Sequence, residues 1–386
     1  MNIMKRDVMS TESIEQVTLV RPPRLMSLDA LRGFTIAAMI LVNNPGSWSH
    51  IYAPLEHARW DGLTPTDLVF PTFLLIMGVS IAIALTNRKA RGSTTLALVA
   101  KILWRSIVIF SLGLALNGFP NYNLETLRIP GVLQRIAVCY LGGSLIFMAC
   151  GPRLQILLIP ILLGLYTAIM RFVEVEGFAP GDLTRAGNVA AYLDRLCLAG
   201  HIYKTDYDPE GVLSTLPALA TTLIGMWAGR RLSSGLRGSQ EVGGLIVASI
   251  IALGCGYVWA TVIPINKALW SGPFVLVSAG YALLALGIAH RLIDLNGKRR
   301  WATPFVIFGV NPIAAFVLSG LTARLIAMEL IPKDATKVAF KPVLYETLFT
   351  PHLSPVNASL AWATSYVVFW LLIMTIFYRY KIIIKV

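Results

Sequence analysis

The chain has 386 residues, of which 56% are hydrophobic and 14% are charged, and its formal net charge is +13. This composition excludes an ordinary soluble enzyme and is typical of a protein that crosses the membrane several times. The excess of Lys and Arg suits a membrane surface with anionic lipids, so the lipid bilayer is an expected partner and nucleic acid is not.

Ten apolar segments are long enough for a helix to cross the hydrocarbon core. Lipid cannot hydrogen-bond to open backbone groups, so each segment is expected to be a helix. We therefore predict an all-α polytopic bundle of about ten spans, with an N-terminal segment at 1–26 and a single transmembrane domain at 27–386. The predicted spans lie near 27–44, 65–86, 96–116, 129–150, 153–172, 211–229, 242–262, 269–292, 302–326 and 358–379.

The basic residues alternate from loop to loop along these spans. With the N-terminus inside, the cytoplasmic segments hold most of the Lys and Arg, as the positive-inside rule requires, so both termini are expected in the cytoplasm. Three longer segments, 45–64, 173–210 and 331–357, are then expected on the far side of the membrane. The segment 173–210 is rich in Asp and Glu, and we expect it to cover a site.

Ionisable side chains gather at the outer mouth of the second predicted span. His57 and Asp61 lie just before this span, and Asp67 lies just inside it. Such groups are costly at a bilayer unless something uses them, and a histidine changes its charge near neutral pH. His57 is therefore our first candidate for a catalytic residue, with Asp61 or Asp67 orienting its ring; a polar interfacial anchor is the alternative.

Other outer helix ends carry carboxylates, amides and aromatic rings, which suit a sugar or an amino sugar. Tryptophans of an interfacial belt and a merely solvated acidic loop are the alternatives. The four cysteines show no paired metal-binding spacing, so no metal is expected. The candidate sugar-binding residues are Asn44, Trp60, Asp208, Glu210, Asn266, Lys267 and Trp270.

Cations also occur inside the predicted spans. Lys101 and Arg105 are four residues apart and share one helix face, and Arg32 follows Asp29 in the first span. A helix cap with a salt bridge explains Asp29 and Arg32 equally well. The functional interpretation is that Arg32, Lys101 and Arg105, with Arg230 or Arg231, hold the phosphates of an anionic cofactor that arrives from the cytoplasm. Arg135, in the fourth span, is a further candidate for cofactor binding.

An ordered set of motifs resembles the heparan-alpha-glucosaminide N-acetyltransferase family. The set begins with Ser27 to Gly33, Val42 to Gly46, His57 to Thr64 and Asp67 to Pro71. It continues along nearly the whole chain, with Gly131 to Ile136, Tyr192 to Leu196, Tyr207 to Gly211, Asn266 to Trp270 and Tyr378 to Val386.

The resemblance implies a polytopic enzyme that moves an acetyl group from cytoplasmic acetyl-coenzyme A to the amine of glucosamine, or of a glucosamine-containing sugar, outside. The family's active-site histidine falls on His57 and its nearby asparagine on Asn43. The chain is similar to the shorter bacterial members, which implies the inner membrane, and the family implies a homodimer. The natural acceptor stays open.

Two mechanisms and one rival function remain at this point. His57 either takes the proton of the attacking amine or carries the acetyl group itself, and an asparagine at position 43 or 44 can donate to the developing oxyanion. The rival is a carrier that passes an amino sugar or a related small solute through the same bundle without covalent change.

Overall fold

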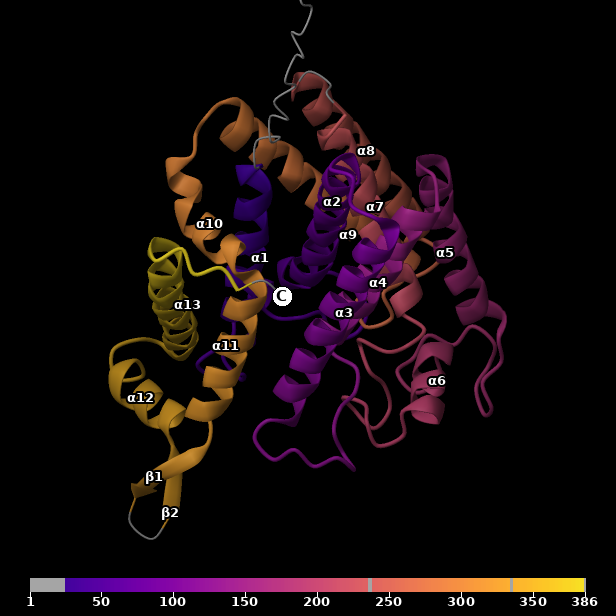
Figure 1. The fold of residues 1–386 in the computed structure, drawn as a ribbon. Coiled ribbons are helices and arrows are strands. Elements are labelled where there is room, and N and C mark those ends of the chain that lie inside the picture. The colour runs from indigo at the N-terminus through magenta and orange to yellow at the C-terminus, as the bar shows by residue number, and fades with distance from the viewer. Residues whose placement is uncertain (1–24, 235–237, 334–335, 385–386) are drawn as a thin grey trace, which may run out of the picture.

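The computed structural model describes residues 25–234, 238–333 and 336–384, so most of the predicted N-terminal segment 1–26 lies outside the described residues. The described part is almost entirely helical, as predicted (Figure 1). Its α-helices are α1 (Met26–Asn43), α2 (Val69–Ala90), α3 (Thr95–Gly118), α4 (Val132–Ala149), α5 (Pro152–Phe172), α6 (Val189–Cys197), α7 (Thr215–Leu232), α8 (Gly238–Trp259), α9 (Gly272–Ala289), α10 (Thr303–Val310), α11 (Pro312–Ile326), α12 (Phe340–Leu348) and α13 (Pro355–Arg379).

Short elements complete the described chain. They are the 3-10 turns η1 (Ala53–Leu55), η2 (Pro65–Leu68) and η4 (Arg300–Ala302), the π-helical turn η3 (His290–Leu295), and the antiparallel strands β1 (Glu329–Lys333) and β2 (Thr336–Ala339).

Eight helices of the described part are long and apolar enough to cross a membrane, and α10 with α11 makes a ninth if the pair is one span. This pair corresponds to the predicted span near 302–326, but it is two helices, because the chain bends by 74° between them. Asn311 leaves the helical conformation there, and the ring of Pro312 disfavours a helical residue before it. The Asn311 side chain bonds to the backbone of Ile382 and Ile384, at 2.9 Å each, so the C-terminal end of the described chain returns to this break.

The sixth predicted span, 211–229, corresponds to α7, which starts four residues later and is not among the helices apolar enough to qualify on their own. This helix instead packs among α2, α4, α5 and α9. Glycines allow the close approach of α2 and α7, because a Cβ at Gly78 would lie 2.1 Å from the Thr222 carbonyl oxygen. The small residues therefore place α7 in the interior of the bundle.

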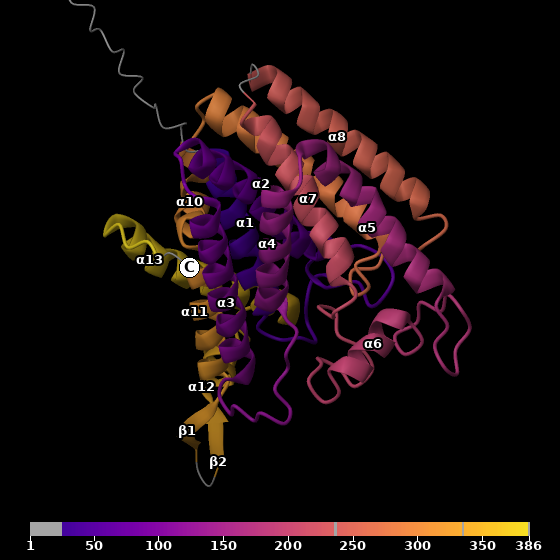
Figure 2. The same cartoon turned by 45° about the vertical axis from the view of Figure 1, so that its right-hand side comes forward.

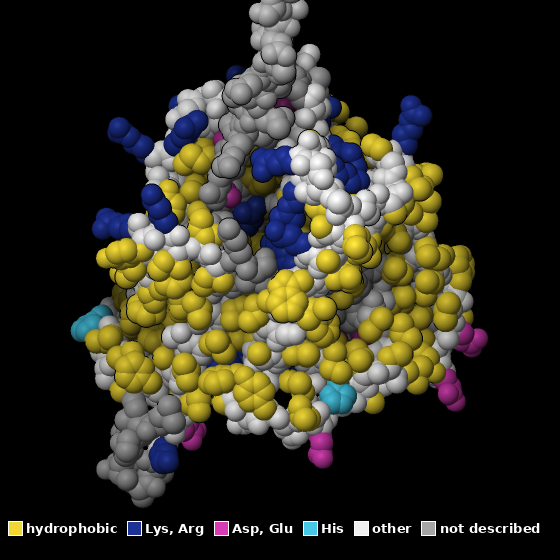
Figure 3. All heavy atoms as spheres, in the orientation of Figure 1, with side chains coloured by type: hydrophobic (Ala, Val, Ile, Leu, Met, Phe, Trp, Pro, Cys, Tyr) yellow, Lys and Arg dark blue, Asp and Glu magenta, His cyan; other side chains and the backbone are white. Residues whose placement is uncertain are grey.

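The two ends of the bundle differ in structure and charge. The β-hairpin, α12 and α6 lie at the end that carries the three predicted outer segments, which are thus not simple loops (Figures 1 and 2). In the view of Figure 3, most of the visible Lys and Arg side chains gather toward the opposite end, and most of the Asp and Glu side chains that project from the surface lie toward the hairpin end. By the positive-inside rule the end with more Lys and Arg would face the cytoplasm, and this orientation stays a prediction.

Candidate active site

A tight turn at the start of the second span fixes the Asp67 carboxylate. Thr64 precedes η2, and its backbone N–H and hydroxyl both donate to Asp67 Oδ2, at 3.1 and 3.0 Å. The N–H of Ala58 donates to the same oxygen at 3.1 Å. Asp67 is only 1% exposed, so these three donors replace the water that the carboxylate loses on burial.

The remaining oxygen of Asp67 faces His57. The distance from Oδ1 to His57 Nδ1 is 2.6 Å. An ionised carboxylate only accepts hydrogen bonds, so the proton of the neutral ring lies on Nδ1 and the lone pair lies on Nε2. The His57 side chain is 47% exposed, so the ring is accessible at this end of the bundle.

Lys267 adds a positive charge to this pair. Its Nζ lies 3.4 Å from Asp67 Oδ1 and 3.0 Å from His57 Nδ1. Burial lowers the pKa of Lys267, although Asp67 and Glu210 act in the opposite direction. The lysine is held by a turn in which Asn266 Nδ2 donates to Asp61 Oδ1 at 3.0 Å and Asn266 Oδ1 accepts from the Leu269 N–H at 2.9 Å.

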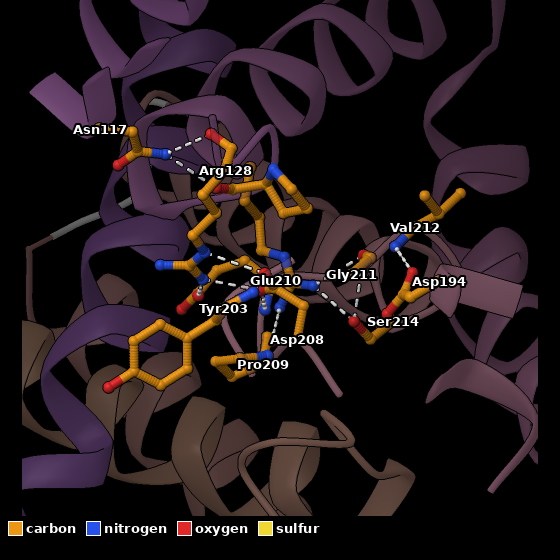
Figure 4. A network of polar contacts seen from close by, with 12 residues as sticks. Asn117, Arg128, Asp194, Tyr203, Asp208, Pro209, Glu210, Gly211, Val212 and Ser214 are labelled. Carbon is orange, nitrogen blue, oxygen red and sulfur yellow. Dashed lines mark hydrogen bonds and ion pairs between the residues drawn. The ribbon is translucent and has the colours of Figure 1, made fainter. Parts of the chain in front are cut away.

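A second polar network involves Arg128, a residue that the sequence did not indicate (Figure 4). Its Nε and Nη2 donate to the two oxygens of Asp208 at 2.9 and 2.7 Å, and Nη2 also donates to Glu210 at 2.6 Å. Although burial opposes it, these two carboxylates raise the pKa of Arg128 above its usual value. Asp208 and Glu210 are therefore held by an arginine.

Arg135 supports the same segment from the first turn of α4. Its Nη1 and Nη2 donate to the carbonyl oxygens of Pro209 and Gly211, each at 3.0 Å, and the guanidinium lies 5.0 Å from the centre of the Trp270 ring. Both Arg135 and Trp270 are buried, at 2% and 1% exposure. In this position Arg135 stabilises the backbone on both sides of Glu210, and its guanidinium group packs against the Trp270 ring.

A cavity of about 480 Å³ opens at the same end of the bundle, between α1, α3, α4, α11, α12 and α13. Arg128 lines it, and this residue connects the cavity to the carboxylates of Asp208 and Glu210. Asn43, Asn44 and Gln134 also contribute to its wall. Asn44 donates from Nδ2 to the Ile40 carbonyl oxygen at 2.7 Å, so its amide group also closes the last turn of α1.

Some residues that the sequence grouped have different surroundings in the structure. His57 is not among the residues that line the cavity containing Asn43. The Trp60 indole donates to the Leu183 carbonyl oxygen at 3.0 Å and packs edge-on against Tyr207 at 5.2 Å. Trp60 thus fastens the predicted cover, 173–210, onto the His57 loop, and its role in sugar binding stays a prediction.

The predicted phosphate-binding cations are also spread out. Arg32 donates to Asp29 at 3.2 Å and to the Ser80 hydroxyl at 2.7 Å. Arg105 lies 4.8 Å from the centre of the Tyr140 ring, and its buried Nε has no hydrogen-bond partner among the described residues. Lys101 is exposed, and Arg135 is in the first turn of α4, toward the hairpin end of the bundle.

Comparison with known proteins decides the family. The profile of the family "Heparan-alpha-glucosaminide N-acetyltransferase, catalytic" matches residues 24–254, which include His57, Asp67 and the Arg128 network. The chain belongs to this family. It is 32% identical to human heparan-alpha-glucosaminide N-acetyltransferase over 354 residues, which cover 77% of this chain and 52% of the human protein.

The mouse heparan-alpha-glucosaminide N-acetyltransferase gives a similar result. It is 32% identical over 352 residues, which cover 76% of this chain and 53% of the mouse protein. The chain spans about half the length of these relatives. Family membership and the apolar helices together make it an integral membrane protein.

Proposed function

We propose that the chain transfers an acetyl group from cytoplasmic acetyl-coenzyme A to the amine of glucosamine, or of a glucosamine-containing sugar, on the extracytoplasmic side. The family membership supports this reaction, and the single observation that carries it is the ordered His57–Asp67–Lys267 group at an accessible end of the bundle. The gathering of Lys and Arg at the other end favours a topology with that end inside, and the bacterial inner membrane is proposed from the resemblance to the shorter bacterial members alone.

In the proposed mechanism, His57 acts as a general base through Nε2. The acceptor amine attacks the thioester carbonyl carbon as the free base, and His57 takes the proton that the nitrogen loses as the C–N bond forms. Asp67 holds the ring and stabilises the imidazolium. The C–S bond then breaks, and the sulfur leaves as a thiol with the proton that His57 returns.

Asn43 is the proposed donor to the oxyanion of the tetrahedral intermediate, a contribution that is typically worth roughly 10²-fold or more in rate. Asp61 is proposed to act indirectly, because its Oδ1 accepts from Asn266 and so steadies the turn that carries Lys267. A covalent acetyl-His57 is the alternative route, in which the same Nε2 attacks the thioester first.

The cations in the other half of the bundle are proposed to bind the coenzyme. Arg32 and Arg105 offer guanidinium groups, which match phosphate geometry, and the unpartnered Nε of Arg105 supports this assignment. Figure 3 shows Lys and Arg side chains around a hollow in that half of the face. A homodimer is proposed from the family alone.

Purified protein in detergent tests the reaction. Labelled acetyl-coenzyme A and glucosamine are expected to give labelled N-acetylglucosamine with the wild type and with His50→Gln, an exposed histidine of the same loop, but not with His57→Gln. Without an acceptor, stable label on His57 would identify the acetyl-histidine route. Equal product from wild type and His57→Gln would remove His57 from the mechanism.

A further inference from the structure

Two cations in the cavity wall have no role in the mechanism above. Arg324 lies in the last turn of α11, and Lys341 lies in the first turn of α12. Arg324 Nη1 donates to the Gly320 carbonyl oxygen at 3.2 Å, and Lys341 Nζ donates to the Pro45 carbonyl oxygen at 2.8 Å. Both residues line the cavity that Asn43 and Arg128 also line.

Neither cation is neutralised by a described carboxylate. Arg128, which lines the same cavity, forms ion pairs with two carboxylates. Among the described residues, the Arg324 and Lys341 side chains instead donate only to backbone carbonyl oxygens. Burial lowers the pKa of Lys341, and no acidic neighbour among the described residues opposes this effect. Partly buried positive charges without counter-ions in a membrane protein are expected where a ligand supplies the negative charge.

A buried amide in the same wall also lacks a partner. Gln134 is 4% exposed, and its Nε2 has no hydrogen-bond partner among the described residues. A buried donor left without an acceptor is destabilising by about 1 to 3 kcal/mol. The cavity therefore offers two positive charges and an amide N–H, all of which need acceptor atoms, and its size is in the usual range for a small-molecule site.

We propose that Arg324 and Lys341 form an anion subsite, so that the preferred acceptor is an amino sugar that also carries a carboxylate or a phosphate. This inference rests on the proposed acetyl transfer. The subsite opens at the hairpin end of the bundle, beside Asn43, and away from the end where the basic loops gather. The acceptor, rather than the coenzyme, is therefore assigned as the source of the anion.

Acceptor preference tests this assignment with the purified full chain. We expect kcat/KM for glucosamine 6-phosphate, or for muramic acid with its carboxylate, to exceed that for glucosamine at least tenfold. In Arg324→Gln/Lys341→Gln the ratio of acidic to neutral acceptor should fall toward one, through KM for the acidic sugar. Lys337→Gln, an exposed lysine on β2, is the matched control and should keep the ratio.

A binding measurement separates this inference from the reaction itself. Trp48 and Trp362 line the cavity, so quenching of tryptophan fluorescence by the acidic sugars reports binding without turnover. Quenching by glucosamine 6-phosphate or muramic acid that is lost in the double variant and kept in Lys337→Gln supports the subsite even if no acetyl transfer occurs. Equal preference for all three sugars, or a double variant whose only defect is a raised KM for acetyl-coenzyme A, would overturn it.

Discussion

Asp67 Oδ1 lies 2.6 Å from His57 Nδ1, while Asp67 Oδ2 accepts three hydrogen bonds from Ala58 and Thr64. One buried carboxylate thus closes the loop 57–64 onto the start of α2 and sets the tautomer of the histidine. The turn and the ring are coupled, so a change at position 67 acts on both.

Asp67→Asn is expected to lower kcat by roughly 10²-fold or more, because an amide that donates to Nδ1 moves the ring proton to Nε2 and removes the base. The measurement is acetyl transfer to glucosamine at saturating substrate. Glu56→Gln, an exposed acid of the same loop, serves as the control and should keep wild-type kcat. An Asp67→Asn variant with wild-type kcat would show that tautomer control is unnecessary.

Arg128→Gln is expected to lower the melting temperature in detergent, because it leaves Asp208 and Glu210 buried without their counter-ion. Removing one partner of a buried ion pair typically destabilises a protein by about 3 to 5 kcal/mol. Adding Asp208→Asn and Glu210→Gln to this variant should restore part of the loss, since the repelling charges are then gone. A triple variant that melts lower than Arg128→Gln would contradict the ion-pair account.

Burial raises the pKa of Asp194 to about 6, although the Val212 N–H donates to its Oδ1 at 2.8 Å. Because the folded pKa lies above the unfolded value of 3.8, the protonated form favours the fold, and stability falls as pH rises from about 4 to about 6. Asp194→Asn keeps an acceptor for Val212 and removes the charge. It should therefore melt higher than wild type at pH 7.5, with a difference that shrinks toward pH 5.

Glu176→Gln is the control for this prediction, because Glu176 is an exposed carboxylate in the same outer segment. Its melting temperature should follow that of the wild type at both pH values. A difference between Asp194→Asn and wild type that stays constant from pH 5 to 7.5 would exclude a raised Asp194 pKa as its cause.

Lys101→Gln/Arg105→Gln is expected to raise KM for acetyl-coenzyme A at least tenfold with little change in KM for the acceptor, because the two cations are proposed to hold phosphates. Lys298→Gln, an exposed lysine in the loop between α9 and α10, controls for the loss of general positive charge. An unaltered KM for acetyl-coenzyme A in the double variant would remove these residues from the coenzyme site.

The sequence predicted the helices well because each long apolar run is itself a physical requirement for spanning a bilayer. The predicted third span, 96–116, and the observed α3, Thr95–Gly118, illustrate the agreement. The break at Asn311 was missed because the apolar run continues through it, although the following proline was a local signal for a bend.

The candidate site was predictable only where its members are neighbours in the chain. His57 and Asp67 are ten residues apart, and the loop that joins them carries the motif that drew attention to both. Arg128 and Asp208 are 80 residues apart, so no spacing rule connects them. The sequence does not indicate Arg324 and Lys341 as binding residues, because only the fold shows that they line one cavity and that no described carboxylate pairs with them.

Acetyl transfer across the membrane of proteoliposomes tests most directly the claim that the chain is a His57-dependent transmembrane acetyltransferase. Vesicles loaded with glucosamine, with labelled acetyl-coenzyme A added outside, are expected to accumulate labelled N-acetylglucosamine inside when they carry the wild type but not when they carry His57→Gln. Product in both, or no product together with saturable glucosamine uptake by the wild type, would contradict a His57-dependent transmembrane acetyltransferase, and the second result would identify a carrier.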